Sequence, residues 1–217
     1  MADTYFGQNS EGYGYHEEAQ DVERVERSRF LEGKVRIIFI LSILQIVCNI
    51  LSNVSIPTGM YRMIQIITVL VGVTYGIILL VMSKKSNHFK IAGICNIAVP
   101  IVTVASVFTY NVTIIYFVAV VMIVVGFVAM CQEMYGFSET LSGINNALSM
   151  KWSELWRLLM TWLVVLFVSL IVFMVIPILG GIGMIVALIA VIVVSVLRLV
   201  CIVDTANAFE NYVRLHQ

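Results

Sequence analysis

The sequence predicts an all-α, polytopic membrane protein with six transmembrane helices in three antiparallel hairpins, and three observations lead to this prediction. Apolar residues make up 60% of the 217 residues, whereas charged residues make up only 12%, about half of the roughly 25% that is usual in soluble domains. The apolar residues lie in long blocks and lack the helical period that a soluble core shows. The longest block, Leu158 to Leu197, contains no Asp, Glu, Lys, Arg or His.

This longest block predicts the last hairpin. A membrane-spanning helix needs roughly 20 apolar residues, so a block twice that length is expected to cross the membrane twice. Pro177 and the glycines that follow it interrupt the block near its middle and supply the turn. The arginines that flank the block, Arg157 and Arg198, then lie on the same side of the membrane.

The start of the chain is polar. Residues 1–16 have too little apolar content to bury, which predicts a disordered cytoplasmic tail. Residues 17–34 carry helical charge spacings such as Glu23 with Arg27, which predict a charged, solvated helix leading into the membrane. A coiled-coil partner for this helix is the less favoured alternative. Because the N-terminal segment is charged, no signal peptide is expected.

The apolar blocks and the distribution of cations predict the membrane topology. Of the 13 Lys and Arg residues, 12 fall on one side of the predicted spans and only Arg62 on the other. Both termini are therefore expected in the cytoplasm, with the protein in the cell (plasma) membrane and residues 204–217 forming a C-terminal tail. The predicted spans are 35–55, 61–82, 91–109, 112–131, 157–178 and 182–203. A duplication relating 35–90 to 155–210 is a further hypothesis.

The segment after the fourth span has a helical period of its own. Apolar residues recur every three or four positions from Phe137 to Leu155, which predicts an amphipathic helix over 137–155. One interpretation places it on the cytoplasmic membrane surface, with Trp152 and Trp156 as interfacial anchors. The other packs it on the cytoplasmic ends of the bundle, and the sequence does not decide between the two.

Neutral polar residues gather on single faces of the first three spans. Two glycines on the second span, Gly72 and Gly76, form a Gly-x-x-x-Gly pair that allows another helix to pack closely. The polar residues share helical spacings of three and four, and we expect Asn49 to hydrogen-bond to Gln65. The candidate set is Ser42, Gln45, Asn49, Ser52, Gln65, Thr68, Asn96 and Thr103.

These polar faces have two interpretations. Neutral hydroxyls and amides commonly hydrogen-bond across helix interfaces in membranes, and this interpretation is favoured. The alternative is that they line a path for a polar, uncharged solute.

The charges that are absent exclude several classes of function. No acidic residue occurs between Glu32 and Glu133, and every histidine lies outside the predicted spans. Proton-coupled and cation-coupled carriers usually need an intramembrane carboxylate or histidine, and haem and zinc sites need histidine or cysteine ligands at suitable spacings. We therefore expect no catalytic residues, no cofactor and no metal. Arg62 and Arg198, at span ends, are expected to snorkel to the membrane surface.

The expected function follows from these exclusions. The chain is expected to be a membrane protein without enzymatic activity. It would act in the lipid bilayer by helix-mediated association with itself, as a homo-oligomer, or with a membrane protein partner. A passive channel or facilitator for a small neutral solute is the alternative, and no nucleic-acid partner is expected.

Overall fold

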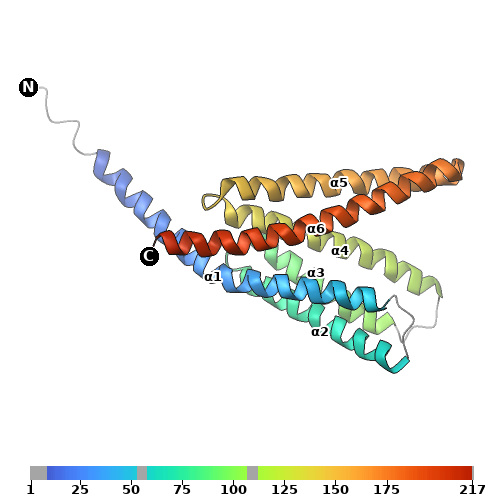
Figure 1. Cartoon of the computed structure of the whole chain (residues 1–217). Helices are drawn as coiled ribbons and strands as arrows, with labels where there is room; N and C mark the ends of the chain where they lie inside the picture. Colours follow the sequence, from blue (N-terminus) through green and yellow to red (C-terminus); the bar gives the residue numbers. More distant parts are fainter. Residues whose placement is uncertain (1–8, 53–57, 107–111, 217) are drawn as a thin grey trace, which may run out of the picture.

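The computed structural model describes residues 9–52, 58–106 and 112–216, and this part of the chain contains six α-helices and no strand. All six helices are long and apolar enough to cross a membrane. Their arrangement is shown in Figure 1. The helices are α1 (Asn9–Ser52), α2 (Thr58–Met82), α3 (Asn87–Ser106), α4 (Val112–Leu141), α5 (Asn146–Val175) and α6 (Pro177–Leu215).

The first and last helices are longer than the sequence predicts. Helix α1 has 44 residues and joins the predicted charged helix to the first span without a break. It begins at Asn9, so residues 9–16 of the predicted disordered tail are helical, and residues 1–8 lie outside the described part of the chain. Helix α6 has 39 residues and includes the predicted C-terminal tail as far as Leu215.

Contacts with α1 explain why α6 continues so far. Phe209 is completely buried at this end of α6, in the same apolar cluster as Leu31 and Val35 of α1. Arg36 of α1 also forms a salt bridge with Glu210 of α6. Because both apolar and charged groups of this segment have partners on α1, it folds as part of the bundle.

The apolar core lies at one end of the bundle, which we call the packed end. It is the end that holds the α2–α3 and α4–α5 turns, and α6 packs against α1 there. The helices pack in chain order, α1 on α2 and so on to α6, which returns to α1. The largest fully buried side chains are Trp152, Phe89, Phe137, Phe209, Leu31 and Ile38.

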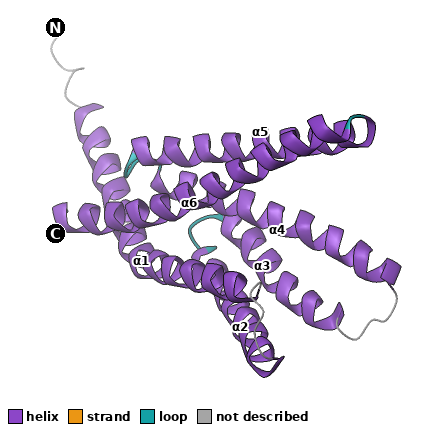
Figure 2. Ribbon diagram, turned by 45° about the vertical axis from the view of Figure 1, so that its right-hand side comes forward, coloured by secondary structure: helices purple, strands orange, loops and turns teal. Residues whose placement is uncertain are grey.

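At the opposite end, which we call the splayed end, the helices diverge. Helices α5 and α6 run side by side in opposite directions and separate from α1–α4 with distance from the packed end (Figures 1 and 2). Near the connection between α5 and α6, Met174 is 84% exposed and Ile178 is 80% exposed. Apolar side chains exposed to this extent are expected where hydrocarbon rather than water surrounds a helix.

A turn divides the segment for which the sequence predicts a single amphipathic helix. Helix α4 ends at Leu141 and α5 begins at Asn146, so residues 137–155 form the end of one helix and the start of the next. Gly143 adopts a φ of 80°, a left-handed conformation that glycine tolerates. Asn145 caps α5 by accepting a hydrogen bond from the Leu148 backbone N–H at 3.1 Å.

The apolar residues of this segment face the core of the packed end. Phe137 and Leu141 at the end of α4 are completely buried, and Leu148 and Leu155 of α5 are nearly so. Trp152 is also completely buried, and its Nε1 donates a hydrogen bond to Thr205 Oγ1 of α6 at 2.9 Å. The period therefore reflects packing against the rest of the bundle, and the cytoplasmic location of this segment stays a prediction.

Candidate functional site

Three polar side chains from three helices meet inside the packed end, and we call them the polar triad: Tyr75, Glu133 and Arg198. Arg198 Nη2 lies 2.7 Å from both carboxylate oxygens of Glu133 and 2.6 Å from the Tyr75 hydroxyl oxygen. The Tyr75 hydroxyl donates to Glu133 Oε1 at 2.7 Å. Glu133 is 1% exposed and Tyr75 is 3% exposed. The triad is thus a hydrogen-bonded network in which Tyr75 and Glu133 are buried and Arg198 is partly buried.

The triad connects alternate helices of the bundle. Tyr75 lies on α2, Glu133 on α4 and Arg198 on α6, and these three helices pack mainly against α1, α3 and α5 rather than against one another. The side chains therefore reach across the interior of the bundle. Met134 and Ile202, each adjacent in helical position to a triad residue, are completely buried, so the network sits within apolar packing.

The electrostatics of the triad make it sensitive to the loss of any member. Removing two opposite charges from water costs several kcal/mol per ion, roughly, and mutual attraction offsets that cost only when the remaining hydrogen-bonding groups are satisfied. Both oxygens of Glu133 accept hydrogen bonds here. Glu133 thus accepts three hydrogen bonds from Arg198 and Tyr75, and its carboxylate joins α4 to α2 and α6.

Two polar atoms close to the triad have no hydrogen-bond partner among the described residues. They are Arg198 Nε and Ser42 Oγ, both buried. Ser42 lies on α1 beside the Tyr75 hydroxyl but without a hydrogen bond of normal geometry. A buried donor without a partner costs about 1–3 kcal/mol, so this side of the triad has unused hydrogen-bonding capacity.

A second group of polar contacts fixes the α2–α3 turn to α4. Ser86 donates to the Glu139 carboxylate, and His88 Nδ1 lies 2.7 Å from Gln132 Oε1. The His88 ring also stacks on Tyr135 with a centroid distance of 5.5 Å. These contacts hold the start of α3 against the end of α4.

The two tryptophans that the sequence suggests as interfacial anchors have different surroundings. Trp152 is completely buried and stacks on Phe137 with ring centroids 4.8 Å apart. Trp156 is partly buried, and its ring lies 5.0 Å from that of Tyr135. Trp152 is thus a core residue that links α5 to α4 and α6.

Most residues of the predicted polar faces hydrogen-bond within their own helices. The Gln65 amide donates to the Tyr61 hydroxyl at 2.8 Å, and the Asn49–Gln65 hydrogen bond stays a prediction. Gln45 is partly buried and Asn49 is exposed. Four side chains donate to the carbonyl four residues earlier: Ser52, Thr68, Asn96 and Thr103. Of the eight, the structure brings Ser42 to the triad.

The Gly-x-x-x-Gly pair lies where α2 crosses α3. A Cβ atom at Gly76 would lie 2.6 Å from Ile97 Cγ1 and 2.8 Å from the carbonyl oxygen of Gly93. A Cβ at Gly72 would lie 3.4 Å from Pro100 Cγ, which is close but ordinary contact. Gly76 and Gly93 therefore allow the two backbones to approach closely.

The pairing of Glu133 with Arg198 was not predicted from the sequence, and the expectation that Arg198 snorkels to the membrane surface is wrong. The Arg198 side chain is 19% exposed and points inward to Glu133. A signal was present in the sequence. Glu133 is the first acidic residue after the fourth apolar block, and Arg198 is the first charge after the longest one. Both therefore lie at the same end of their helices with opposite charges.

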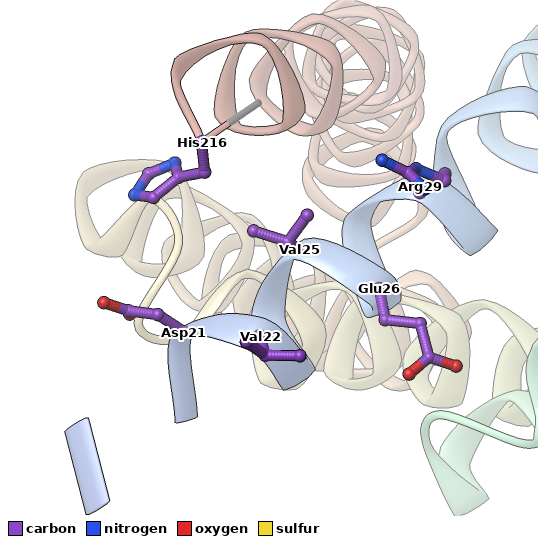
Figure 3. A pocket seen from close by; sticks show the side chains of 6 residues that line it. All are labelled: Asp21, Val22, Val25, Glu26, Arg29 and His216. Atoms are coloured by element: carbon purple, nitrogen blue, oxygen red, sulfur yellow. The ribbon is translucent and has the colours of Figure 1, made fainter. Parts of the chain in front are cut away.

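Outside the triad, a surface pocket of about 570 Å³ lies between α1 and the end of α6. Five of its lining side chains come from α1, and His216, which directly follows α6, projects toward them (Figure 3). His216 is itself stacked on Tyr212, with ring centroids 4.3 Å apart. Its lining combines acidic, basic and apolar groups, and the pocket is open to solvent.

The described residues do not form a candidate metal site. Within residues 9–52, 58–106 and 112–216, no three His, Cys, Asp or Glu side chains are grouped to hold a metal ion. The four cysteines, Cys48, Cys95, Cys131 and Cys201, are all free thiols.

Comparison of the chain with protein-family models, with curated proteins and with solved structures gave no match.

Proposed function

We propose that the chain is a multi-pass protein of the cell membrane, without enzymatic activity, that acts by associating in the plane of the membrane with a second copy of itself or with another membrane protein. Its six helices form three antiparallel hairpins. The packed end lies in the cytoplasm, because 12 of the 13 Lys and Arg residues are on that side. Both termini are then cytoplasmic.

The divergence of the helices at the splayed end is the observation that carries this proposal. None of the described side chains of α4 between Thr113 and Val128 is buried, and Ser169 is the one buried residue of α5 between Met160 and Val175. Helices associate in lipid through close packing and interhelical hydrogen bonds. Here α4 and the α5–α6 pair leave most of that packing unmade within one chain, which leaves long helix faces for a partner.

The packed end supports the same proposal by its rigidity. The polar triad joins α2, α4 and α6, and Trp152 joins α5 to α6. These contacts constrain the packed halves of the helices, from which the splayed halves extend. A pre-positioned set of helix faces loses less conformational entropy when a partner binds.

Mass determination of the purified protein in mild detergent, together with identification of co-purifying membrane proteins, tests the proposal. We expect an oligomer or a stable hetero-complex. Cysteine cross-linking then locates the interface: Ile123→Cys on α4, whose native side chain is 71% exposed, should cross-link between chains in membranes. Val22→Cys, on the polar part of α1 and 68% exposed in the native protein, is the control and should not. A strict monomer without a partner contradicts the proposal.

A second candidate, a passive facilitator for a small neutral solute, is favoured by one specific observation. Along α1 the predicted polar face becomes progressively less exposed toward the triad, from Asn49 through Gln45 to Ser42, which is 5% exposed. Such a face would guide a polar solute toward the triad, which would close the path at the packed end.

Substitution of Asn49 distinguishes the two candidates. If α1 lines a solute path, Asn49→Leu should abolish uptake of neutral solutes into proteoliposomes and leave thermal stability in detergent unchanged. If the polar face serves helix association, the same change should lower thermal stability or shift the oligomer distribution. If proteoliposomes that contain the wild-type protein take up no neutral solute, the facilitator is excluded.

A further inference from the structure

A groove of about 420 Å³ lies between α5 and α6 at the border between their charged and apolar parts. It is separate from the polar triad and from the pocket at α1. Its lining includes three charged side chains and a set of apolar ones. Among the lining residues are Lys151, Glu154, Asp204, Leu158, Leu197 and Val200.

The groove has a charged half and an apolar half. Because α5 and α6 run in opposite directions, the step from Lys151 to Leu158 on α5 runs parallel to the step from Asp204 to Leu197 on α6. Each step is seven residues, about 10 Å along a helix. Leu158 and Leu197 are the two ends of the charge-free run, so the apolar half begins where the hydrocarbon begins and the charged half lies at the depth of lipid headgroups.

The charged half carries one cation and two carboxylates that form no ion pair within the described part of the chain. Lys151 and Glu154 are exposed and Asp204 is partly buried. None of the three forms a salt bridge with another described residue. A ligand with a phosphate for Lys151 and an ammonium group shared by the two carboxylates would give each of the three side chains an oppositely charged partner.

The apolar half continues the groove along the membrane-spanning part of the helices. Leu158 and Leu197 are about 40% exposed and Val200 is 52% exposed, so their side chains are accessible to an acyl chain. Leu155 and Cys201, which also line the groove, are buried. A molecule that fits both halves has a zwitterionic headgroup and a hydrocarbon tail.

We propose that this groove binds phosphatidylethanolamine from the surrounding membrane. The lipid phosphate contacts Lys151, the primary ammonium group donates hydrogen bonds to Glu154 and Asp204, and one acyl chain lies along Leu158, Leu197 and Val200. The groove favours this lipid over two common alternatives. The quaternary ammonium of phosphatidylcholine has no N–H to donate, and an anionic phosphatidylglycerol headgroup meets two carboxylates against one lysine. The inference requires that the helices cross a membrane, but it does not depend on the proposed association.

Native mass spectrometry of the full chain in mild detergent, with phosphatidylethanolamine, phosphatidylcholine or phosphatidylglycerol added at equal concentrations, tests the proposal. We expect preferential retention of phosphatidylethanolamine. The variant with both Glu154→Gln and Asp204→Asn should lose about tenfold or more of the preference over phosphatidylcholine, since charge-assisted hydrogen bonds are lost. Lys151→Gln should weaken retention of all three lipids. Glu26→Gln, an exposed carboxylate on α1, is the matched control and should change nothing.

Three results would overturn the assignment. Equal retention of the three lipids by the wild-type protein is the first, and an unchanged preference in the double variant is the second. The third is displacement of the lipid by soluble glycerophosphoethanolamine at micromolar concentration, because the free headgroup compound would then be the ligand. The same spectra report the number of chains in each complex, so failure of the lipid assignment and failure of the proposed association are read separately. Thermal unfolding of each variant verifies that it is folded.

Discussion

Arg198 of α6 places a single nitrogen, Nη2, 2.7 Å from both carboxylate oxygens of Glu133 on α4. The two residues are 65 positions apart in the chain, and Glu133 is 1% exposed. A buried ion pair is sensitive to the removal of one partner, since the other charge is then left in an apolar environment. This relationship makes the pair the most informative site at which to test how the packed end is held together.

Glu133→Gln should destabilise the protein strongly. Removal of one partner from a buried ion pair costs about 3–5 kcal/mol, and Arg198 would be left without a counter-charge. Thermal or denaturant unfolding in detergent measures the loss, and Glu26→Gln on the exposed part of α1 serves as the control that should leave stability unchanged. Replacing both partners, Glu133→Leu with Arg198→Met, should recover much of the loss. A single Glu133→Gln variant as stable as the wild type would show that the pair does not join α4 to α6.

Tyr75→Phe should destabilise the protein less than the loss of Glu133. The phenol donates to Glu133 Oε1 at 2.7 Å, and a hydrogen bond to a charged group contributes about 1.5–3 kcal/mol. Because Tyr75 acts through Glu133, the effects of Tyr75→Phe and Glu133→Gln should not add in the double variant. A double-mutant cycle of unfolding free energies measures the coupling. Fully additive effects would mean that Tyr75 stabilises the fold independently of the ion pair.

Trp152 should behave as a core residue and not as an anchor at the membrane surface. With Trp156→Phe and Trp162→Phe in the same chain, the remaining Trp152 should fluoresce at short wavelength and resist quenching by aqueous iodide. Thr205→Val should reduce stability by about 1–3 kcal/mol, because the buried Trp152 Nε1 loses its acceptor. Strong iodide quenching of Trp152 in the folded protein would instead favour a position at the membrane surface.

The helix content, and the length and apolar composition that would allow the helices to cross a membrane, could be predicted from the sequence, because both depend on local composition. The forty-residue run and Pro177 predict the separation of α5 from α6, and the structure places that break at Ile176. The turn at Gly143 could not be predicted from the spacing of apolar residues, since apolar residues on both sides of it keep the helical period. A period shows that residues share a face, and it does not show whether lipid or protein covers that face.

The contacts of the candidate site could not be predicted from local patterns in the sequence, because they join residues on different helices. The spacing predicts that Ser42 lies on a polar face, but its position beside Tyr75, which donates to Glu133, depends on how α1 packs on α2. The contact between Glu133 and Arg198 depends on how α4 and α6 rotate about their axes. Neutral polar residues such as Thr68 and Asn96 satisfy their hydroxyl and amide groups on their own backbones, so polar spacing alone could not separate an interface from a side chain bonded to its own helix.

The crossing of α2 and α3 gives the last prediction, and it has a control within the same bundle. At Gly76 a Cβ would come within 2.6 Å of Ile97 Cγ1 and 2.8 Å of the Gly93 carbonyl oxygen. The backbone atom cannot move without separating the helices, so Gly76→Ala should cost about 1–3 kcal/mol, as overpacking does elsewhere. A Cβ added at Gly126 of α4 would have no neighbouring atom within 4 Å, and Gly126→Ala should be neutral or stabilise by up to about 1 kcal/mol through helix propensity. The free energy of unfolding in detergent should therefore fall for Gly76→Ala and stay unchanged or rise for Gly126→Ala. Equal stabilities would mean that α2 and α3 do not approach as closely in the membrane as they do in this structure.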